Sequence, residues 1–264
     1  MCSEIVIGGL TLHPYGLFIA FGILVGMSLC MWYTPKHNMN RDVLVDLLLC
    51  MVAGGLVGAK LLGVIVNLKH VLNGSLTLLQ ALSVTVVYGG ILGALSACAV
   101  YCKVKKIDFW RYSDLCLSCV AVTQGIGRLG CLMAGCCYGI EYSGFGAITF
   151  TNSPFAPNNV SLFPTQIVSS LFMLTFGIAS IIYCNKKQHK PGSIGTNYIL
   201  VYGLARSFIE NFRGDAARGF VFGMSTSQFI SIFFIAIGFA AKLWLFKQRK
   251  EQAKIKWEGV NSNE

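Results

Sequence analysis

Long apolar runs, separated by short polar segments, make up most of this chain. Each run is close to the ~20 residues that an α-helix needs to cross the hydrocarbon core of a bilayer. The pattern therefore predicts an all-α polytopic membrane protein with about seven transmembrane helices and a small outer-face segment. The predicted spans are Tyr15–Tyr33, Val45–Val66, Val84–Cys102, Leu115–Leu132, Leu162–Cys184, Gly195–Asn211 and Met224–Phe246.

The longest interval between predicted spans runs over Ile140–Ser161. Pro154 and Pro157 within it indicate turns. A short strand pair is expected around Ala147–Thr151, and no interval is long enough for a soluble domain.

The composition also indicates an integral membrane protein. Of the 264 residues, 55% are hydrophobic and only 12% are charged, whereas an average soluble domain is about 25% charged. Residues 1–250 are therefore predicted to form a single transmembrane domain. Residues 251–264 are predicted to be a cytoplasmic tail that frays from Ile255 onward.

Basic residues gather on one side of the predicted spans. The formal net charge of +10 is interpreted as cytoplasmic loops that contact anionic membrane lipid, not as a nucleic-acid surface. The positive-inside rule then predicts an external N-terminus and a cytoplasmic C-terminus. The inner-side residues are Lys36, Arg41, Lys103, Lys105, Lys106, Arg111, Lys186, Lys187, Lys190, Lys247, Arg249, Lys250, Lys254 and Lys256, against Lys69, Arg213 and Arg218 on the outer side.

The segment Gly125–Gly139, which reads GIGRLGCLMAGCCYG, has an unusual composition for a membrane segment. It contains five glycines, three cysteines and Arg128 as its single charged residue. Glycine lets the backbone approach a ligand closely, and an arginine at membrane depth needs a partner. One interpretation is a buried anion site made of backbone amides and a guanidinium. The alternative is a close helix-packing motif whose arginine extends to the membrane interface.

A second charged cluster lies in the sixth predicted span. Arg206, Glu210 and Arg213 share one face if the segment is helical. They could form a self-neutralising ion network, or a net positive face that receives a phosphate. The predicted topology places this end of the span at the same membrane face as Arg128, which favours the second interpretation.

Most of the eleven cysteines lie inside apolar runs, where they act as small hydrophobic residues. Cys131, Cys136 and Cys137 lie together in the glycine-rich segment. They have no neighbouring histidine and no CxxC spacing, so the pattern predicts no metal site and no cofactor. A disulfide between Cys131 and one of the other two, or a thiol that takes part in chemistry, remains open.

These motifs resemble the prolipoprotein diacylglyceryl transferase family, bacterial membrane enzymes of lipoprotein maturation. The segment Gly127–Gly139 is similar to the family's GRxGN-type signature. Other family marks recur in order along nearly the whole chain. They are His13-Pro14-Tyr15-Gly16, Tyr88-Gly89-Gly90-Ile91-Leu92-Gly93, Asp114, Phe163-Pro164-Thr165-Gln166, Tyr202-Gly203 to Arg206 and Glu210, and Ser227-Gln228.

The resemblance implies seven transmembrane helices in the bacterial cytoplasmic (inner) membrane, with an active site facing the outer leaflet. It implies transfer of a diacylglyceryl group from phosphatidylglycerol to the lipobox cysteine of prolipoprotein signal peptides, with release of glycerol phosphate. Arg128 and Arg206 match arginines that serve the phospholipid head group. The expected catalytic residues are Arg128, Arg206, Glu210, Tyr88 and Tyr15, and the expected substrate-binding residues are Arg128, Gly130, Cys131, Gly139, Arg206 and Arg213.

The chain also departs from the family pattern at polar positions. Tyr88 stands where the family usually has histidine, and Cys131 where it has asparagine. Ala134-Gly135-Cys136 replaces Asn-Gly-Glu, and Lys60 replaces a common arginine. Two alternatives are therefore a non-catalytic protein that binds anionic phospholipid and a relative that acts on another acceptor. A transporter is disfavoured because the sequence has no internal repeat.

The chemistry sets two requirements. A thiolate attacks a glycerol carbon and a phosphate ester leaves, so positive charge from Arg128 and Arg206 must face the leaving phosphate. The acceptor thiol, with a free pKa near ~8.5, must also lose its proton. Tyr88 is a poor base at neutral pH. Glu210 could be the base or could hold the arginines in place, so proton removal has no assigned residue.

Overall fold

The computed structural model describes residues 5–7, 10–12, 14–186, 190–215, 220–221 and 223–261. His13, Lys187 and Arg218, which carry part of the sequence interpretation, lie outside these ranges. The described chain is mainly helical. Its helices are α1 (Pro14–Tyr33), the 3-10 helix η1 (Thr34–His37), α2 (Arg41–Val66), α3 (Leu68–Leu72), α4 (Leu78–Ser83), α5 (Val87–Lys105), α6 (Phe109–Ala134), α7 (Thr165–Lys186), α8 (Ser193–Glu210) and α9 (Thr226–Asn261).

Six helices of the described chain are long and apolar enough to cross a membrane. They are Pro14–His37, which covers α1 and η1, then α2, α5, α6, Thr165–Cys184 of α7 and Thr226–Glu251 of α9. The remaining expected span corresponds to α8, which is more polar because it carries Asn197, Arg206 and Glu210. The all-α polytopic class is confirmed, whereas the expected count of seven spans is not.

The chain divides into two compact units. The first comprises Met1–Ser28 and Ser113–Glu264, and the second comprises Leu29–Tyr112. The motif segment Gly125–Gly139 and the charged residues around Arg206 belong to the first unit.

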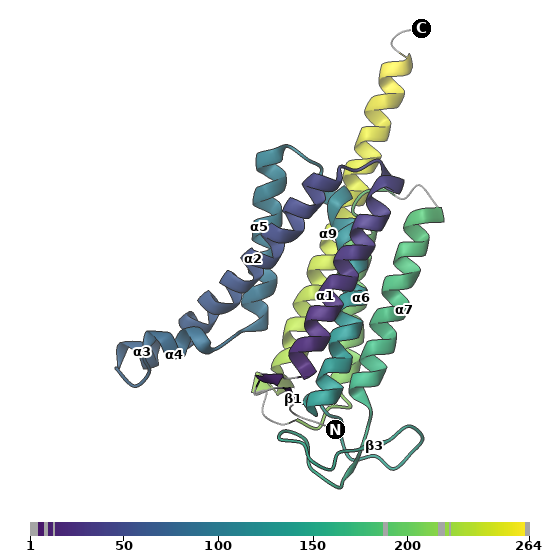
Figure 1. The fold of residues 1–264 in the computed structure, drawn as a ribbon. Coiled ribbons are helices and arrows are strands. Elements are labelled where there is room, and N and C mark those ends of the chain that lie inside the picture. The colour runs from purple at the N-terminus through teal and green to yellow at the C-terminus, as the bar shows by residue number, and fades with distance from the viewer. Residues whose placement is uncertain are drawn as a thin grey trace. The chain divides into compact units, whose positions relative to one another are not determined.

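In the first unit, α6 lies beside α1 and α7 (Figure 1), and it approaches each of them closely at small residues. The Thr123 hydroxyl of α6 donates a 2.9 Å hydrogen bond to the Gly22 carbonyl of α1. On the other side of α6, a Cβ added at Gly125 would come within 2.6 Å of Leu174 on α7. Such close approach lets helices associate within a membrane, where no hydrophobic effect drives them together.

In the second unit, α2 and α5 pack through matched glycines. A Cβ added at Gly54 would lie 2.8 Å from the Gly93 carbonyl oxygen, and one at Gly58 would meet the Gly89 carbonyl oxygen. This explains the glycines that follow Tyr88 as a helix-packing motif. Lys60 of α2 donates hydrogen bonds to the Ser83 carbonyl (3.3 Å) and the Thr85 hydroxyl (3.0 Å).

Short hairpins complete the fold. The predicted strand near Ala147–Thr151 is β3 (Ile148–Thr149), and its antiparallel partner is β4 (Ser161–Leu162), farther along the chain than expected. Phe150, Ala156 and Leu162 form a small buried core beneath this segment. The other two hairpins pair β1 (Ile5–Ile7) with β2 (Leu10–Leu12), and β5 (Phe220–Val221) with β6 (Met224–Ser225).

The end of the chain differs from the expectation in one respect. Residues from Ile255 were predicted to fray, but α9 continues without interruption to Asn261. The prediction of a frayed segment is therefore wrong for residues 255–261. Residues 262–264 lie outside the described residues.

Candidate active site

The C-terminal end of α6 folds back through a Schellman turn. The Cys136 N–H donates to the Cys131 carbonyl (3.1 Å), and the Gly135 N–H donates to the Leu132 carbonyl (3.2 Å). Gly135 adopts φ +72°, the left-handed conformation that this turn requires after the last helical residue and that glycine adopts without strain. The turn brings Cys136 back beside Cys131, five residues earlier in the chain.

Two buried side chains at the start of α7 hold the next part of the motif. The Thr165 hydroxyl donates a 2.7 Å hydrogen bond to the Cys137 carbonyl. The Gln166 amide donates a 2.9 Å hydrogen bond to the Cys136 carbonyl. Cys137 has φ +61°, an uncommon conformation for a residue with a Cβ, which persists only where the surroundings hold it. The Thr-Gln pair of the Phe163–Gln166 mark therefore positions the two adjacent cysteines.

Gly139 lies where three backbone segments meet. Gly139 forms an isolated bridge with Arg213, and the Ile140 N–H donates to the Phe212 carbonyl (3.0 Å). A Cβ at Gly139 would meet the Phe163 carbonyl oxygen and lie 2.8 Å from the Phe163 Cβ. Only glycine permits this approach. The motif is thereby tied to the segment that follows α8.

Three arginines converge near the end of α6. The Arg128 guanidinium interacts electrostatically with Cys131, Cys137 and Arg213. Arg206 is close enough to be affected by the charges of Arg128 and Arg213. The convergence expected from the topology is therefore present within the first unit.

Two of these arginines have carboxylate partners. Arg206 forms a 3.2 Å ion pair with Glu210, whose side chain is 4% exposed, and donates a 2.9 Å hydrogen bond to the Ser227 hydroxyl. Arg213 binds Asp215 through two hydrogen bonds of 2.9 and 2.7 Å. The sequence suggested one helical face for Arg206, Glu210 and Arg213. However, α8 ends at Glu210, so Arg213 lies in the following segment and pairs with a different carboxylate.

Arg128 differs from these two arginines. It is partly buried on α6. Among the residues that the structure describes, no carboxylate forms an ion pair with its guanidinium and no group accepts a hydrogen bond from it. A desolvated charge without a partner is unfavourable in a protein interior. The arrangement is therefore suited to an anionic group supplied by a ligand.

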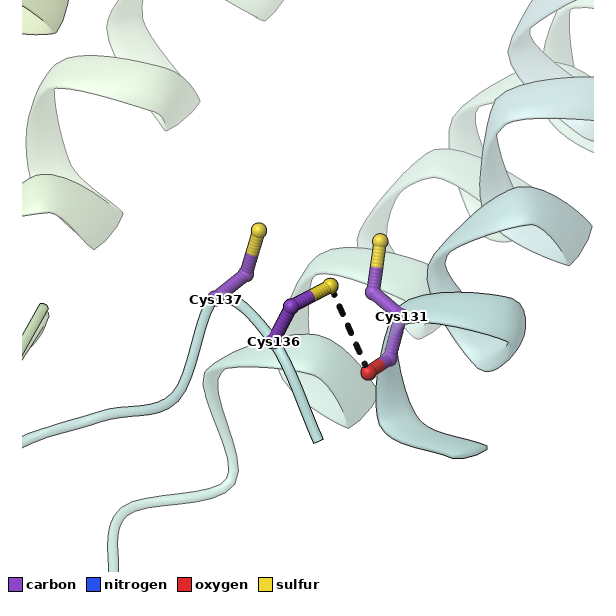
Figure 2. A group of neighbouring side chains, drawn as sticks. All are labelled: Cys131, Cys136 and Cys137. Atoms are coloured by element: carbon purple, nitrogen blue, oxygen red, sulfur yellow. Dashed lines mark hydrogen bonds between the residues drawn. The ribbon is translucent and has the colours of Figure 1, made fainter. Parts of the chain in front are cut away.

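The sulfur atoms of Cys131, Cys136 and Cys137 all lie within 4.8 Å of one another (Figure 2). Hydrogen bonding with Cys131 and Cys136, together with the positive charges of Arg213 and Arg128, lowers the pKa of Cys137. Hydrogen bonding with Cys131 and Cys137, reinforced by burial, raises the pKa of Cys136. The Cys137 thiol therefore loses its proton more readily than the Cys136 thiol. In the thiolate form, a cysteine sulfur is a ligand for soft metal ions.

The other predicted site residues fall in different places. Gly130 faces α1, where an added Cβ would lie 3.2 Å from the Tyr15 carbonyl oxygen. Tyr15 is half-exposed and lies within electrostatic reach of Cys131 and Arg128. Tyr88 lies at the start of α5 and belongs to the second unit.

Sequence reasoning gave no site role to three residues that complete the site, although Tyr202 and Ser227 stand in its family marks. Asp215 and Ser227 bind the arginines, and Tyr202 lies within electrostatic reach of Arg128. Tyr202 sits one helical turn before Arg206, so the 3.6-residue period of α8 could have indicated it. Asp215 gave no such signal, because its pairing depends on where α8 ends.

Fold and site together define a multi-pass membrane protein with an arginine-rich, cysteine-containing centre at one end of a long apolar helix. A sequence model of the prolipoprotein diacylglyceryl transferase family matches residues 4–244. The chain belongs to this family.

Similar proteins include several with the same printed name. The phosphatidylglycerol–prolipoprotein diacylglyceryl transferase of Clostridium tetani is 40% identical over 232 residues, which is 87% of this chain and 92% of the relative. Transferase 2 of that name in Clostridium perfringens is 37% identical over 239 residues, covering 89% and 93% of the two chains. A relative in Dehalococcoides mccartyi is 28% identical over 249 residues, or 93% of each chain.

Proposed function

We propose that this chain transfers the diacylglyceryl group of phosphatidylglycerol to the lipobox cysteine of prolipoprotein signal peptides and releases glycerol phosphate. The main support for this proposal is the Arg128 guanidinium. Within the described residues it has no carboxylate partner, so it is available to bind the phosphate of a lipid. Family membership supports the reaction, since relatives that align over most of this chain are named for it.

Arg128 binds the phosphate of the lipid and stabilises the charge that grows on it as the glycerol carbon–oxygen bond breaks. Arg206 adds a second positive charge, and Glu210 fixes its direction through their ion pair. Arg213, which is held by two hydrogen bonds to Asp215, contributes a third positive charge to the site. Tyr15, Gly130 and Gly139 shape the site next to the reacting groups.

The protein acts in the bacterial cytoplasmic membrane, with an external N-terminus and a cytoplasmic C-terminus, as the distribution of its basic residues favours. Residues 1–250 work as one transmembrane domain, and Tyr88 takes part in the reaction. The segment 251–264 is the cytoplasmic tail.

The test is transfer itself. Purified protein in phosphatidylglycerol liposomes is incubated with a lipobox peptide, and a diacylglyceryl thioether is sought by mass spectrometry. Arg128→Ala should abolish the product. Arg249→Ala is the matched control, because the Arg249 guanidinium hydrogen-bonds the Pro191 carbonyl (2.6 Å), near the opposite end of α8. That variant should retain transfer.

The same experiment tests the main alternative. The replacement of polar family residues at Tyr88 and Cys131 is the observation that favours a non-catalytic phospholipid-binding protein or a different acceptor. Wild-type protein that binds phosphatidylglycerol through Arg128 but yields no thioether would support that alternative and contradict the transferase.

A further inference from the structure

The sulfur atoms of Cys131, Cys136 and Cys137 lie close together, although the spacing of these residues in the sequence does not match a common metal-binding motif. The Schellman turn at Gly135 places Cys136 beside Cys131, and the next residue adds a third thiol. In Figure 2, Cys136 lies between the other two cysteines, and its thiol donates a 3.7 Å hydrogen bond to the Cys131 carbonyl. Three sulfur ligands therefore come from seven consecutive residues of the chain.

The spacing of the sulfur atoms suits a single zinc ion. Sulfurs bound to zinc at about 2.3 Å lie roughly 3.8 Å apart in tetrahedral geometry. The three sulfurs already lie within 4.8 Å of one another, so each pair must close by at most about 1 Å to reach that geometry. Rotation of the cysteine side chains can supply this movement.

The surroundings also fit a thiolate metal centre. Metal-bound cysteines are deprotonated, so three thiolates and Zn²⁺ carry a net charge of about −1. Arg128 and Arg213 both act electrostatically on Cys137 and offset that charge. Thr165 and Gln166 fix the backbone of the two adjacent cysteines, as partners outside a metal's ligand sphere commonly do.

We propose that Cys131, Cys136 and Cys137 bind a zinc ion whose fourth position takes the acceptor cysteine thiolate. Three protein ligands with one open position are the usual arrangement of catalytic zinc. The role of the fourth position rests on the transferase function proposed above, whereas zinc binding by the three cysteines does not.

This assignment solves the problem of proton removal. A thiol that coordinates a metal is deprotonated outright, so no nearby histidine is needed. The acceptor thiol releases its proton to solvent when it binds zinc. Its sulfur then forms a bond to the glycerol carbon, and the carbon–oxygen bond breaks, with its electron pair leaving on the phosphate. The thioether product is a weaker ligand and dissociates, and zinc keeps its oxidation state throughout.

The first test measures zinc in the full-length, reduced protein after dialysis against Zn²⁺. We expect about one zinc per chain, and Co²⁺ in its place should show sulfur-to-cobalt charge-transfer absorption. Ser substitutions at Cys131, Cys136 and Cys137 should each weaken zinc binding strongly. The loss should exceed the roughly 10–100-fold that is typical when a residue hydrogen-bonded to a metal ligand is removed. Cys119→Ser is the matched control, because Cys119 is a buried α6 cysteine outside the cluster.

Zinc binding that is absent from the reduced wild-type protein, or unchanged in Cys136→Ser, would overturn the site. The second test adds a lipobox peptide to the Co²⁺-loaded protein. The charge-transfer absorption should change with the cysteine peptide and stay constant with a peptide that has serine at that position. An identical response to both peptides would refute coordination of the acceptor. Neither readout depends on turnover. If the peptide thiol coordinates but no thioether forms with phosphatidylglycerol, the transferase function fails while the metal site stands.

Discussion

The Thr165 hydroxyl, at the start of α7, holds the backbone carbonyl of Cys137 through a 2.7 Å hydrogen bond. Thr165 is 2% exposed, so water cannot replace this bond if the hydroxyl is removed. The bond links a residue of one predicted family mark to a residue of another, 28 positions earlier. It holds Cys137 in its positive-φ conformation.

Thr165→Val should therefore impair both stability and function. It keeps the side-chain shape but leaves a buried carbonyl without its donor, which costs about 1–3 kcal/mol. We expect a lower unfolding temperature in detergent and reduced transfer to a lipobox peptide. Thr196→Val is the matched control, because the hydroxyl of this buried threonine donates a 2.8 Å hydrogen bond to the carbonyl of Gly192, the residue that caps its own helix. Equal loss of transfer in both variants would argue against a specific role for the Thr165 bond.

Arg128 should show a conflict between stability and function. Because this guanidinium lacks a carboxylate partner among the described residues, Arg128→Met removes an unfavourable charge without exposing another. We expect an unchanged or higher unfolding temperature together with loss of transfer. Arg128→Lys should also lose most activity, since an ammonium cannot replace a planar, bidentate guanidinium.

Arg206→Met provides the contrast to Arg128→Met. It deprives the buried Glu210 carboxylate of its 3.2 Å ion pair, and breaking a buried pair in this way costs roughly 3–5 kcal/mol. Thermal unfolding of the two variants, measured side by side, should separate them. If Arg128→Met destabilised the protein as much as Arg206→Met, Arg128 would have a structural role instead.

Several features of this molecule could be predicted from particular residues. The apolar runs gave the membrane class because their lengths match a bilayer. The basic loop residues gave a topology that placed Arg128 and Arg206 at one face, and these two arginines do converge. The sequence marked Tyr88–Gly93 only as a family motif, and the structure shows that Gly89 and Gly93 pack closely against α2.

Other features depend on where helices end, which sequence patterns indicate poorly. The grouping of Arg213 with Glu210 assumed a continuous helix, but α8 stops at Glu210. The spacing of Cys131 and Cys136 matches no common ligand pattern, so the sequence argued against a metal site. Their proximity arises from the left-handed turn at Gly135, which closes a five-residue separation that a continuing helix would leave on different faces.

Asp114 should be a structural residue. It is fully buried and accepts hydrogen bonds from the backbone N–H groups of Gly192 (2.8 Å) and Gly195 (2.7 Å). These donors belong to the N-terminal end of α8, where a carboxylate also interacts favourably with the helix dipole. Asp114→Ala should lose roughly 3 kcal/mol or more, because each hydrogen bond to a charged group contributes about 1.5–3 kcal/mol.

The size of this loss can be measured by thermal unfolding in detergent. Asp114→Asn keeps one acceptor oxygen and should fall between the wild type and Asp114→Ala. Asp46→Ala is the control, since Asp46 accepts an exposed 3.1 Å hydrogen bond from Tyr101 and should cost little. An Asp114→Ala variant as stable as Asp46→Ala would show that α8 does not depend on this carboxylate.

Two glycines of the same motif should respond oppositely to alanine. A Cβ at Gly139 would meet the Phe163 backbone, so Gly139→Ala must displace the chain that ties the motif to Arg213. A Cβ at Gly127 has nothing within 4 Å, and alanine is favoured over glycine inside a helix by about 1 kcal/mol. We therefore expect Gly139→Ala to lower the unfolding temperature and Gly127→Ala to keep or raise it. Equal destabilisation by both substitutions would mean that the glycines serve chain flexibility and not the backbone contact at Phe163.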